Sequence, residues 1–300
     1  MERCKEYLVT EPETRKGAWR TPGRSLNLEI GCGKGSFTCA LAAAEPEQDL
    51  VAIEKVPDAM ILAMERAQAA GLRNVCFLDY DAAKLRELHR LSGGNIRVAC
   101  VAPEADGAVE FIREAAEFCR VSAAHTAADY SAGIRAVNAG ISNATHLYNA
   151  MNDVTRREPG CAAALLESGC FCEVICDGIH LHPAVIRLTH RIVGAERLCI
   201  VSDGMAATGL GNGTFSLGTQ TVTVNGSEAR LENGSLAGSV TDIRSAFFKA
   251  VEFGIPPLDA LRAVTLNPAR ALGIDSYLGT IEAGKSARLT RLNPDIFRNV

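Results

Sequence analysis

The sequence lacks the features of a membrane, secreted or nucleic-acid-binding protein. It has no apolar run near the roughly 20 residues of a membrane-spanning helix, and its polar start contains no signal-peptide core. A formal net charge of −4 provides no basic surface for nucleic acid over the whole chain. The eleven cysteines include no Cys-x-x-Cys pair, so buried free thiols fit better than a disulfide framework or a zinc ribbon. We therefore expect a cytoplasmic protein.

A repeated pattern marks the later part of the chain: a short apolar run stops at a histidine or an acidic residue. The stops are Glu104, His125, His146, His180 and Asp203, at intervals of 21, 21, 34 and 23 residues. Each interval holds a strand, a turn and a returning helix, which predicts a parallel sheet. Polar residues at the carboxyl ends of such strands are typical of a (β/α) barrel active site. One such histidine alone is more often a hydrogen-bonded strand-end residue, whereas five stops in register favour a site.

Three of these residues have the chemistry of a metal site. Glu104 offers carboxylate oxygens, and His125 and His146 offer imidazole nitrogens. An oxygen and two imidazoles together suit a borderline divalent metal such as zinc. The pattern therefore predicts that these three side chains converge on one metal ion.

The first part of the chain alternates strands with helices in the order βαβαβ. A glycine-rich turn, Gly31-Cys-Gly33-Lys-Gly35, follows the first strand, and Glu54 ends the second. Glycines there let a ligand approach the backbone, and an acidic residue at that strand end can bind ribose hydroxyls. This arrangement favours a nucleotide-type site over a plain tight turn. The expected strands are 26–30, 50–53 and 75–78, and the expected helices are 36–44 and 57–70.

Several motifs in this first part belong together. They are Lys16-Gly-Ala-Trp19, Leu28-Glu-Ile-Gly-Cys-Gly-Lys-Gly35, Ile53-Glu-Lys-Val-Pro57 and Ala63-Met-Glu65. Residues 1 to about 92 thereby resemble the cofactor-binding half of the bacterial tRNA (guanine-N7-)-methyltransferases. The resemblance stops before that family's substrate half, whose Pro-Trp-Pro-Lys stretch is absent because the one tryptophan is Trp19. It implies no tRNA binding, and it implies S-adenosylmethionine contacts at Glu29, Gly31, Glu54 and Asp81.

A second set of motifs runs from about Asn95 to the end. They are Val101-Ala-Pro-Glu104, Ala144-Thr-His-Leu-Tyr-Asn-Ala-Met151, Arg157-Glu-Pro-Gly160, Asp177-Gly-Ile-His180, Val201-Ser-Asp203, Leu236-Ala-Gly-Ser239 and Leu266-Asn-Pro-Ala-Arg-Ala-Leu272. This part resembles the N-acetylglucosamine-6-phosphate deacetylases of the amidohydrolase superfamily. The resemblance implies a homodimer that converts N-acetylglucosamine 6-phosphate to glucosamine 6-phosphate and acetate.

The same resemblance implies a role for each site residue. Glu104, His125 and His146 would hold the metal, and Asp203 would be the general acid and base that moves protons between water and the departing amine. The residues that would bind the sugar phosphate, some of them across the dimer interface, are Asn149, Ala150, Arg157 and His180.

We therefore expect an α/β fold with two parts. Residues 1–92 would form a Rossmann-like βαβαβ fragment, and residues 93–300 a partial (β/α)8 TIM-like barrel of the amidohydrolase type that lacks its first strands. Such a chain resembles a fusion of two truncated enzymes. In an alternative arrangement, the strands of residues 1–92 join the later strands and close a hybrid barrel, with 98–102 paired beside 75–78. A β-hairpin is expected over 214–231.

Three functions stay open on the sequence alone. The first is the metal-dependent deacetylase, the second is a methyltransferase fragment, and the third is a non-catalytic binder of S-adenosylmethionine or a sugar phosphate. We expect poor or absent S-adenosylmethionine affinity in the full chain, because the strand after the third one belongs to the barrel part and leaves the cofactor crevice unformed.

Overall fold

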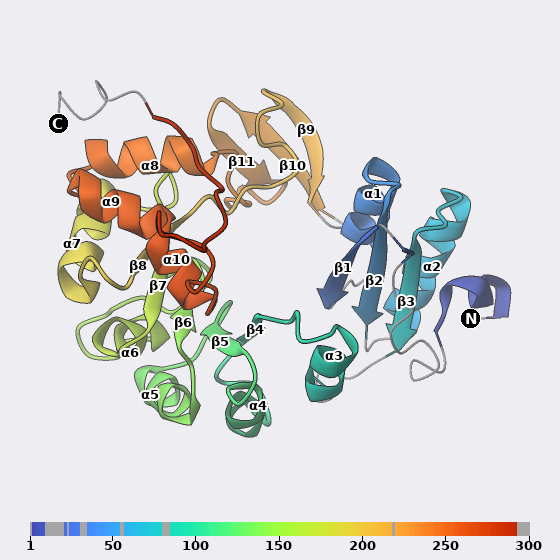
Figure 1. The fold of residues 1–300 in the computed structure, drawn as a ribbon, viewed down its shortest axis with the longest axis horizontal. Coiled ribbons are helices and arrows are strands. Elements are labelled where there is room, and N and C mark those ends of the chain that lie inside the picture. The colour runs from blue at the N-terminus through green and yellow to red at the C-terminus, as the bar shows by residue number, and fades with distance from the viewer. Residues whose placement is uncertain are drawn as a thin grey trace. The chain divides into compact units, whose positions relative to one another are not determined.

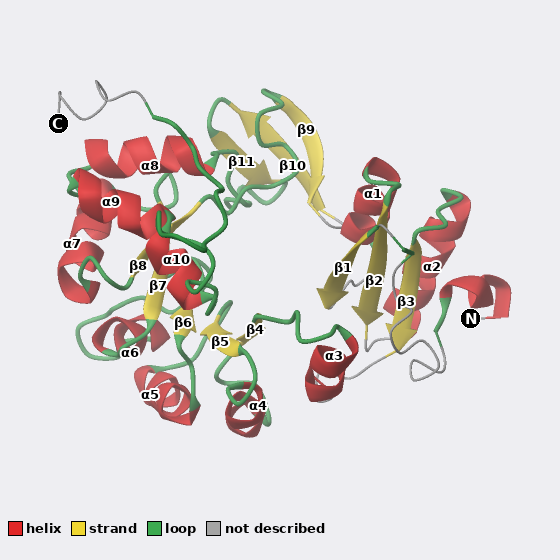
Figure 2. Ribbon diagram, in the orientation of Figure 1, coloured by secondary structure: helices red, strands yellow, loops and turns green. Residues whose placement is uncertain are grey.

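The chain divides into two compact units, and each contains parallel strand pairs with helices between them (Figures 1 and 2). One unit comprises residues 1–95 with 214–223 and 231–235, and the other comprises residues 96–213, 224–230 and 236–300. The computed structural model describes residues 2–9, 21–22, 24–30, 35–54, 57–79, 85–217 and 220–292.

The first unit contains a three-stranded parallel sheet in the order β1-β2-β3. Helices α1 and α2 connect its strands, as parallel neighbours require. The predicted order of strands and helices is therefore confirmed. The bounds are β1 Ser25–Ile30, α1 Ser36–Ala44, β2 Gln48–Glu54, α2 Pro57–Ala69 and β3 Val75–Asp79, with the 3-10 helix η1 at Glu2–Tyr7 and α3 at Leu85–Leu91.

The free edge of β3 carries a segment from the start of the chain. Leu8 forms a parallel bridge with Phe77, and the Val9 N–H donates to the Phe77 carbonyl at 2.9 Å. The later strand 98–101 belongs to a different sheet. The alternative that paired it beside β3 in a hybrid barrel is therefore wrong, because Leu8 and Val9 occupy that edge.

Buried side chains of α2 and β3 form the core of the first unit. Met60, Met64 and Phe77 are completely buried. The amide of Asn74 donates to the carbonyls of Ala42, Glu45 and Gln48 at 2.9–3.1 Å, which ties the end of α1 to the start of β2. Buried carbonyls at a helix end need such partners.

The second unit is built on five parallel strands whose order in the sheet follows the chain, β4-β5-β6-β7-β8. One helix joins each strand to the next, and α8, α9 and α10 all pack against β8. The bounds are β4 Val98–Val101, α4 Ala108–Ala115, β5 Arg120–Ala123, α5 Tyr130–Ala139, β6 Asn143–Ala144, α6 Cys161–Glu167, β7 Phe171–Ile175, α7 Pro183–Val193, β8 Leu198–Val201, α8 Ile243–Glu252, α9 Pro257–Val264 and α10 Leu266–Ala271.

The residue pattern of these elements explains how they pack. Helix α4 buries Ala108, Ile112 and Ala115, which lie on one face at helical spacing. Strands β7 and β8 are almost entirely apolar, and Val174 and Leu198 are completely buried. Such runs are typical of strands in parallel sheets that are covered on both faces.

The segment expected to be a hairpin contains three strands, β9 Gly213–Leu217, β10 Gln220–Asn225 and β11 Glu228–Leu231, in the order β11-β10-β9. The hairpin prediction missed a strand, because the turn at Gly226, whose φ is 62°, separates β10 from a further strand, β11.

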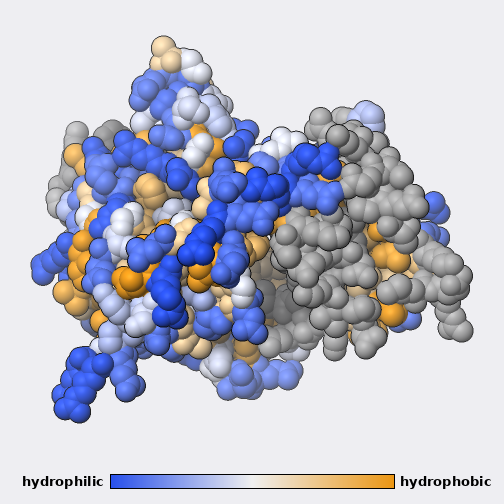
Figure 3. Space-filling view, turned by 90° about the horizontal axis from the view of Figure 1, so that it is seen from below, coloured by the Kyte–Doolittle hydropathy of each residue, from blue (hydrophilic) through white to orange (hydrophobic). Residues whose placement is uncertain are grey.

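None of the helices in the described ranges is both long enough and apolar enough to cross a membrane. On the face shown in Figure 3, hydrophobic residues form separate patches among hydrophilic ones.

Candidate functional site

Four predicted site residues follow the ends of strands in the second unit. Glu104 comes three residues after β4, and His125, His146 and Asp203 come two residues after β5, β6 and β8. The last three adopt left-handed backbone conformations, with φ values of 45°, 32° and 48°. Non-glycine residues rarely take this conformation, and those that do cluster at functional sites. The strand ends therefore have an unusual shared geometry.

The His125 and His146 rings lie close together, with their planes tilted by 51°. The Nε2 atoms of His125 and His146 are 2.9 Å apart, and the ring centroids are 4.7 Å apart. Burial lowers the pKa of His125, His146 lowers it further, and the charge of Asp203 opposes both effects. The His146 side chain is buried, and its Nδ1 has no hydrogen-bond partner. This pair is therefore a nitrogen-rich centre at the sheet's carboxyl edge.

Glu104 is held by the two residues that follow His125 in the chain. Its Oε2 accepts a hydrogen bond from the Thr126 hydroxyl at 2.5 Å, and its Oε1 accepts one from the Ala127 N–H at 2.6 Å. Burial would raise the pKa of Glu104, but these hydrogen bonds outweigh it and lower the pKa. The carboxylate is therefore ionised and already bonded at both oxygens.

These side chains fit a divalent metal in part. The Nε2 atoms of His125 and His146 would hold a divalent cation in place of their hydrogen bond, and imidazole is a suitable ligand. Glu104 has the right chemistry, but it would have to exchange its hydrogen bonds to Thr126 and Ala127. Within the part of the chain that the structure describes, no three His, Cys, Asp or Glu side chains are arranged to hold a metal. The structure thus brings His125 and His146 together, whereas Glu104 bonds to the two residues that follow His125.

Asp203 is exposed after β8. Its carbonyl accepts a hydrogen bond from the Ser239 N–H at 2.8 Å, which anchors its left-handed backbone. Its charge raises the pKa of both His125 and His180, although burial of each ring acts in the opposite direction and is the larger single effect. Asp203 is therefore close enough to influence both rings.

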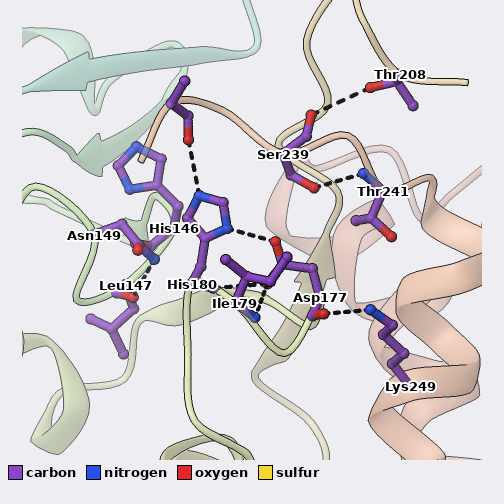
Figure 4. Close-up of polar contacts among 11 residues, drawn as sticks. His146, Leu147, Asn149, Asp177, Ile179, His180, Thr208, Ser239, Thr241 and Lys249 are labelled. Carbon is purple, nitrogen blue, oxygen red and sulfur yellow. Dashed lines mark hydrogen bonds and ion pairs between the residues drawn. The ribbon is translucent and has the colours of Figure 1, made fainter. Parts of the chain in front are cut away.

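His180 lies on a turn, and the expectation that it ends a strand is wrong. Strand β7 ends at Ile175, and the Asp177 Oδ1 accepts from the N–H groups of Ile179 and His180, both at 2.9 Å, which makes the turn. The His180 ring lies between two acceptors, with its Nδ1 2.6 Å from Asp177 Oδ2 and its Nε2 3.0 Å from the Ala237 carbonyl (Figure 4). Both partners only accept hydrogen bonds, so both ring nitrogens carry protons.

The ionisation of this pair agrees with its geometry. Burial alone would lower the pKa of His180, but the hydrogen bond and charge of Asp177 raise it above the ordinary value. Burial would raise the pKa of Asp177, but the His180 ring and the turn N–H groups lower it. Lys249 of α8 also donates to the Asp177 carbonyl at 2.5 Å. The His180 imidazolium therefore forms a buried ion pair with Asp177, whose backbone is held by Lys249.

The other predicted substrate residues lie in the stretch after His146. The Asn149 amide donates to the carbonyls of His146 and Leu147, at 3.1 and 3.3 Å, and the Ala150 carbonyl accepts from the Thr126 N–H at 2.9 Å. Arg157 belongs to a run of exposed residues, 152–158, that borders a surface hollow of about 600 Å³. Arg157 thus borders this hollow and comes eleven residues after His146 in the chain.

The predicted cofactor turn of the first unit is described only in part. Gly31, Gly33 and Asp81 lie outside the described residues, and of Glu29 and Glu54 only the backbone, on β1 and β2, is described. Gly35 begins α1 with φ 70°, and a Cβ there would lie 2.5 Å from the Ala63 Cβ. Only glycine fits such a position. Packing of α1 on α2 is thus sufficient to explain Gly35.

Sequence reasoning missed three residues of the second unit. Thr126 holds Glu104, Asp177 holds His180, and the Glu173 Oε2 accepts from the His146 N–H at 3.3 Å. Two signals were available. Asp177 precedes His180 by three residues, the spacing of a local turn, and Glu173 is a charged residue inside an otherwise apolar strand.

Comparison with known proteins supports the sequence resemblance. The Amidohydrolase family model matches residues 79–299, and a methyltransferase family model matches residues 23–95. An N-acetylgalactosamine-6-phosphate deacetylase of Escherichia coli is 34% identical over 220 residues, 72% of this chain and 58% of that protein. An N-acetylglucosamine-6-phosphate deacetylase of Bacillus subtilis is 36% identical over 218 residues, 72% of this chain and 55% of that protein.

Solved structures give the same result. A mutant N-acetyl-D-glucosamine-6-phosphate deacetylase of Mycobacterium smegmatis, in complex with N-acetyl-D-glucosamine-6-phosphate, matches with a TM-score of 0.69 and 31% identity, over 91% of this chain and 82% of that one. The Pasteurella multocida deacetylase matches with a TM-score of 0.68 and 26% identity, over 88% and 80% of the two chains. The chain spans just over half the length of the curated relatives that it matches. It belongs to the amidohydrolase family.

Proposed function

We propose that this chain hydrolyses the acetamide of N-acetylglucosamine 6-phosphate to glucosamine 6-phosphate and acetate. The observation that carries the proposal is the convergence of His125 and His146, from the ends of neighbouring parallel strands, at an Nε2–Nε2 distance of 2.9 Å. Active sites of (β/α) barrels lie at this end of the strands. The named relatives that span most of this chain are deacetylases of amino-sugar 6-phosphates.

The proposed metal ligands are Glu104, His125 and His146, with zinc as the metal. When bound, such a metal polarises the scissile carbonyl and lowers the pKa of water. Metal binding requires deprotonated ligands, and the lowered pKa values of Glu104 and His125 favour that state. Amidohydrolase deacetylases use a divalent metal, in agreement with this ligand set.

Asp203 is the proposed general base and acid. Its carboxylate accepts the proton of the attacking water, the water oxygen bonds to the acetyl carbon, and Asp203 then returns the proton to the nitrogen as the C–N bond breaks. The exposed carboxylate and its influence on His125 support this role. One water is consumed, and acetate and the protonated amine are released.

The phosphate is proposed to bind to positive charge from His180 and Arg157. The His180 imidazolium is fixed by Asp177, whereas Arg157 lies in the exposed run 152–158. An exposed Arg157 fits a role in a homodimer, in which it would reach the partner's substrate. Asn149 and Ala150, directly after His146, would contact the sugar.

The strand order also supports the proposed domain division. Five parallel strands in chain order, each joined to the next by a helix, are what five consecutive units of a (β/α)8 barrel would form. We assign residues 93–300 to such a partial barrel of the amidohydrolase type. Residues 1–92 are assigned to a Rossmann-like βαβαβ fragment, in agreement with the methyltransferase match at 23–95.

The test is acetate release from N-acetylglucosamine 6-phosphate by the full chain supplied with zinc. We expect turnover by the parent protein and none by His146→Ala. His190→Ala is the matched control, because His190 pairs with Asp259 on α9 and has no role in the proposed chemistry. No acetate release by a folded, metal-loaded parent would refute the proposal.

A further inference from the structure

Glu173 is a carboxylate that the proposed chemistry does not use. It stands in the middle of β7, in register with Cys199 of β8, and its neighbours Cys172 and Val174 are completely buried. A charged residue in such a strand is costly unless its carboxylate has a partner. We propose that Glu173 is a positioning residue that holds the backbone of His146, an inference that rests on the proposed metal site.

The contacts of Glu173 converge on one short piece of backbone. Its side-chain Oε2 accepts from the His146 N–H at 3.3 Å, and its main-chain carbonyl accepts from the Leu147 N–H at 2.8 Å. Two successive N–H groups after β6 are therefore bound by one residue of the neighbouring strand. The main-chain bond belongs to any residue at this position, whereas the bond to His146 depends on the Glu173 side chain.

The backbone at His146 needs such support. Its φ is 32°, and Tyr148 and Ala150, two and four residues later, have φ values of 74° and 49°. Non-glycine residues keep this left-handed conformation only where the surrounding structure holds them. The Glu173 carboxylate is the side-chain acceptor for the first N–H of this strained stretch.

The His146 ring has a hydrogen-bond partner at Nε2 and none at Nδ1. Metal-binding histidines usually donate the second ring nitrogen to a carboxylate or carbonyl, which sets the direction of the ring. In His146 that nitrogen, Nδ1, is buried without a partner. The direction of Nε2 toward His125 therefore depends on the backbone of His146, and this is the part that Glu173 holds.

The experiment compares Glu173→Gln with Glu173→Leu in the full chain. Glutamine keeps an acceptor oxygen at the same reach and removes the charge, whereas leucine removes the acceptor. Val174→Ala, a substitution of the fully buried next residue, is the control for general damage to β7. Two quantities are measured: zinc affinity against a competing chelator, and hydrogen exchange of the His146 amide in metal-free protein.

In Glu173→Leu we expect zinc affinity to fall about 10- to 100-fold, as for other partners that orient metal ligands. The His146 amide should exchange about three- to tenfold faster, the loss of one hydrogen bond. Glu173→Gln and Val174→Ala should match the parent in both measurements. This pattern supports the positioning role, because only the acceptor distinguishes the two Glu173 variants.

Other outcomes overturn the inference in distinguishable ways. A folded Glu173→Leu protein with parental zinc affinity and parental His146 exchange refutes the positioning role while leaving the proposed metal site intact. If Glu173→Gln is as weak as Glu173→Leu, the charge acts on the metal directly, and the hydrogen bond is not the cause. If the parent itself binds no zinc, the proposed site fails and this inference fails with it.

Discussion

The ion pair between Asp177 and His180 leads to a prediction about stability and pH. Only 3% of the Asp177 side chain and 8% of the His180 side chain are exposed, and the two are joined at 2.6 Å. Asp177→Asn removes the charge and keeps the shape. It leaves a buried imidazolium without a counter-ion, and removal of one partner from a buried pair costs about 3–5 kcal/mol. Near pH 5.5 we expect the free energy of unfolding to fall by about 3 kcal/mol. This is the lower end of that range, because His180 can avoid part of the cost by releasing its proton.

The effect should depend on pH in a defined direction. The pKa of His180 is raised in the folded protein. Its contribution to folding stability is therefore fully present below the unfolded pKa of about 6.5 and is lost as pH rises through the folded pKa. Because the pKa of Asp177 is lowered, its contribution is present above the unfolded value of about 3.9 and is lost as pH falls through the folded pKa. Above the folded pKa of His180, the unfolding free energies of Asp177→Asn and the parent should differ by about 1 kcal/mol, the contribution of one ordinary hydrogen bond.

Urea unfolding of both proteins from pH 5 to pH 9 measures this difference. Asp259→Asn is the matched control, since the His190–Asp259 pair is partly exposed, with 17% and 26% of the two side chains accessible, and should contribute less than about 1 kcal/mol. A difference between the Asp177→Asn variant and the parent that stays constant across this range would refute the charged pair. It would mean that His180 is neutral and that its two acceptors are satisfied in another way.

Three further predictions concern the metal site, the general base and S-adenosylmethionine binding. Metal analysis should find one equivalent of zinc in the parent and less in His125→Ala and His146→Ala; equal contents would mean that the ligands are misassigned. Asp203→Asn should keep the metal and lose hydrolysis, since an amide cannot accept and return the proton; turnover within about tenfold of the parent, or 1.4 kcal/mol of barrier, would point to another base. Calorimetry should find weak or no S-adenosylmethionine binding by the full chain, because β1 is an edge strand of the described three-stranded sheet and a cofactor crevice needs strands on both sides of it. Tight binding that Glu54→Ala abolishes would contradict this.

The structure gives a different physical reason to expect weak S-adenosylmethionine binding. The sequence suggested that 98–102 would join β3 and so prevent a cofactor crevice. In the structure, Leu8 and Val9 occupy that edge, and β4 belongs to another sheet. Local periodicity identifies a strand but says nothing about its neighbour, because pairing depends on contacts between residues far apart in the chain.

The sequence by itself determined the order of the elements and the positions at which function is concentrated. Apolar runs that stop at Glu104, His125, His146 and Asp203 predict strand ends, because the period of an apolar run and its termination are local properties. The structure puts the first three of these strands side by side, and the two imidazoles meet. The family resemblance over residues 95–300 was likewise visible without any coordinates.

Only the tertiary structure decided which hydrogen-bond partner each of these site residues has. The acceptor of His180 Nε2 is a carbonyl 57 residues later, and the side-chain acceptor of the His146 N–H is Glu173, 27 residues later on another strand. The Glu104 carboxylate accepts hydrogen bonds from Thr126 and Ala127, although its position after β4 suggested a ligand that faces the histidines. These partners are set by how strands and turns pack, so no local pattern in the chain encodes them.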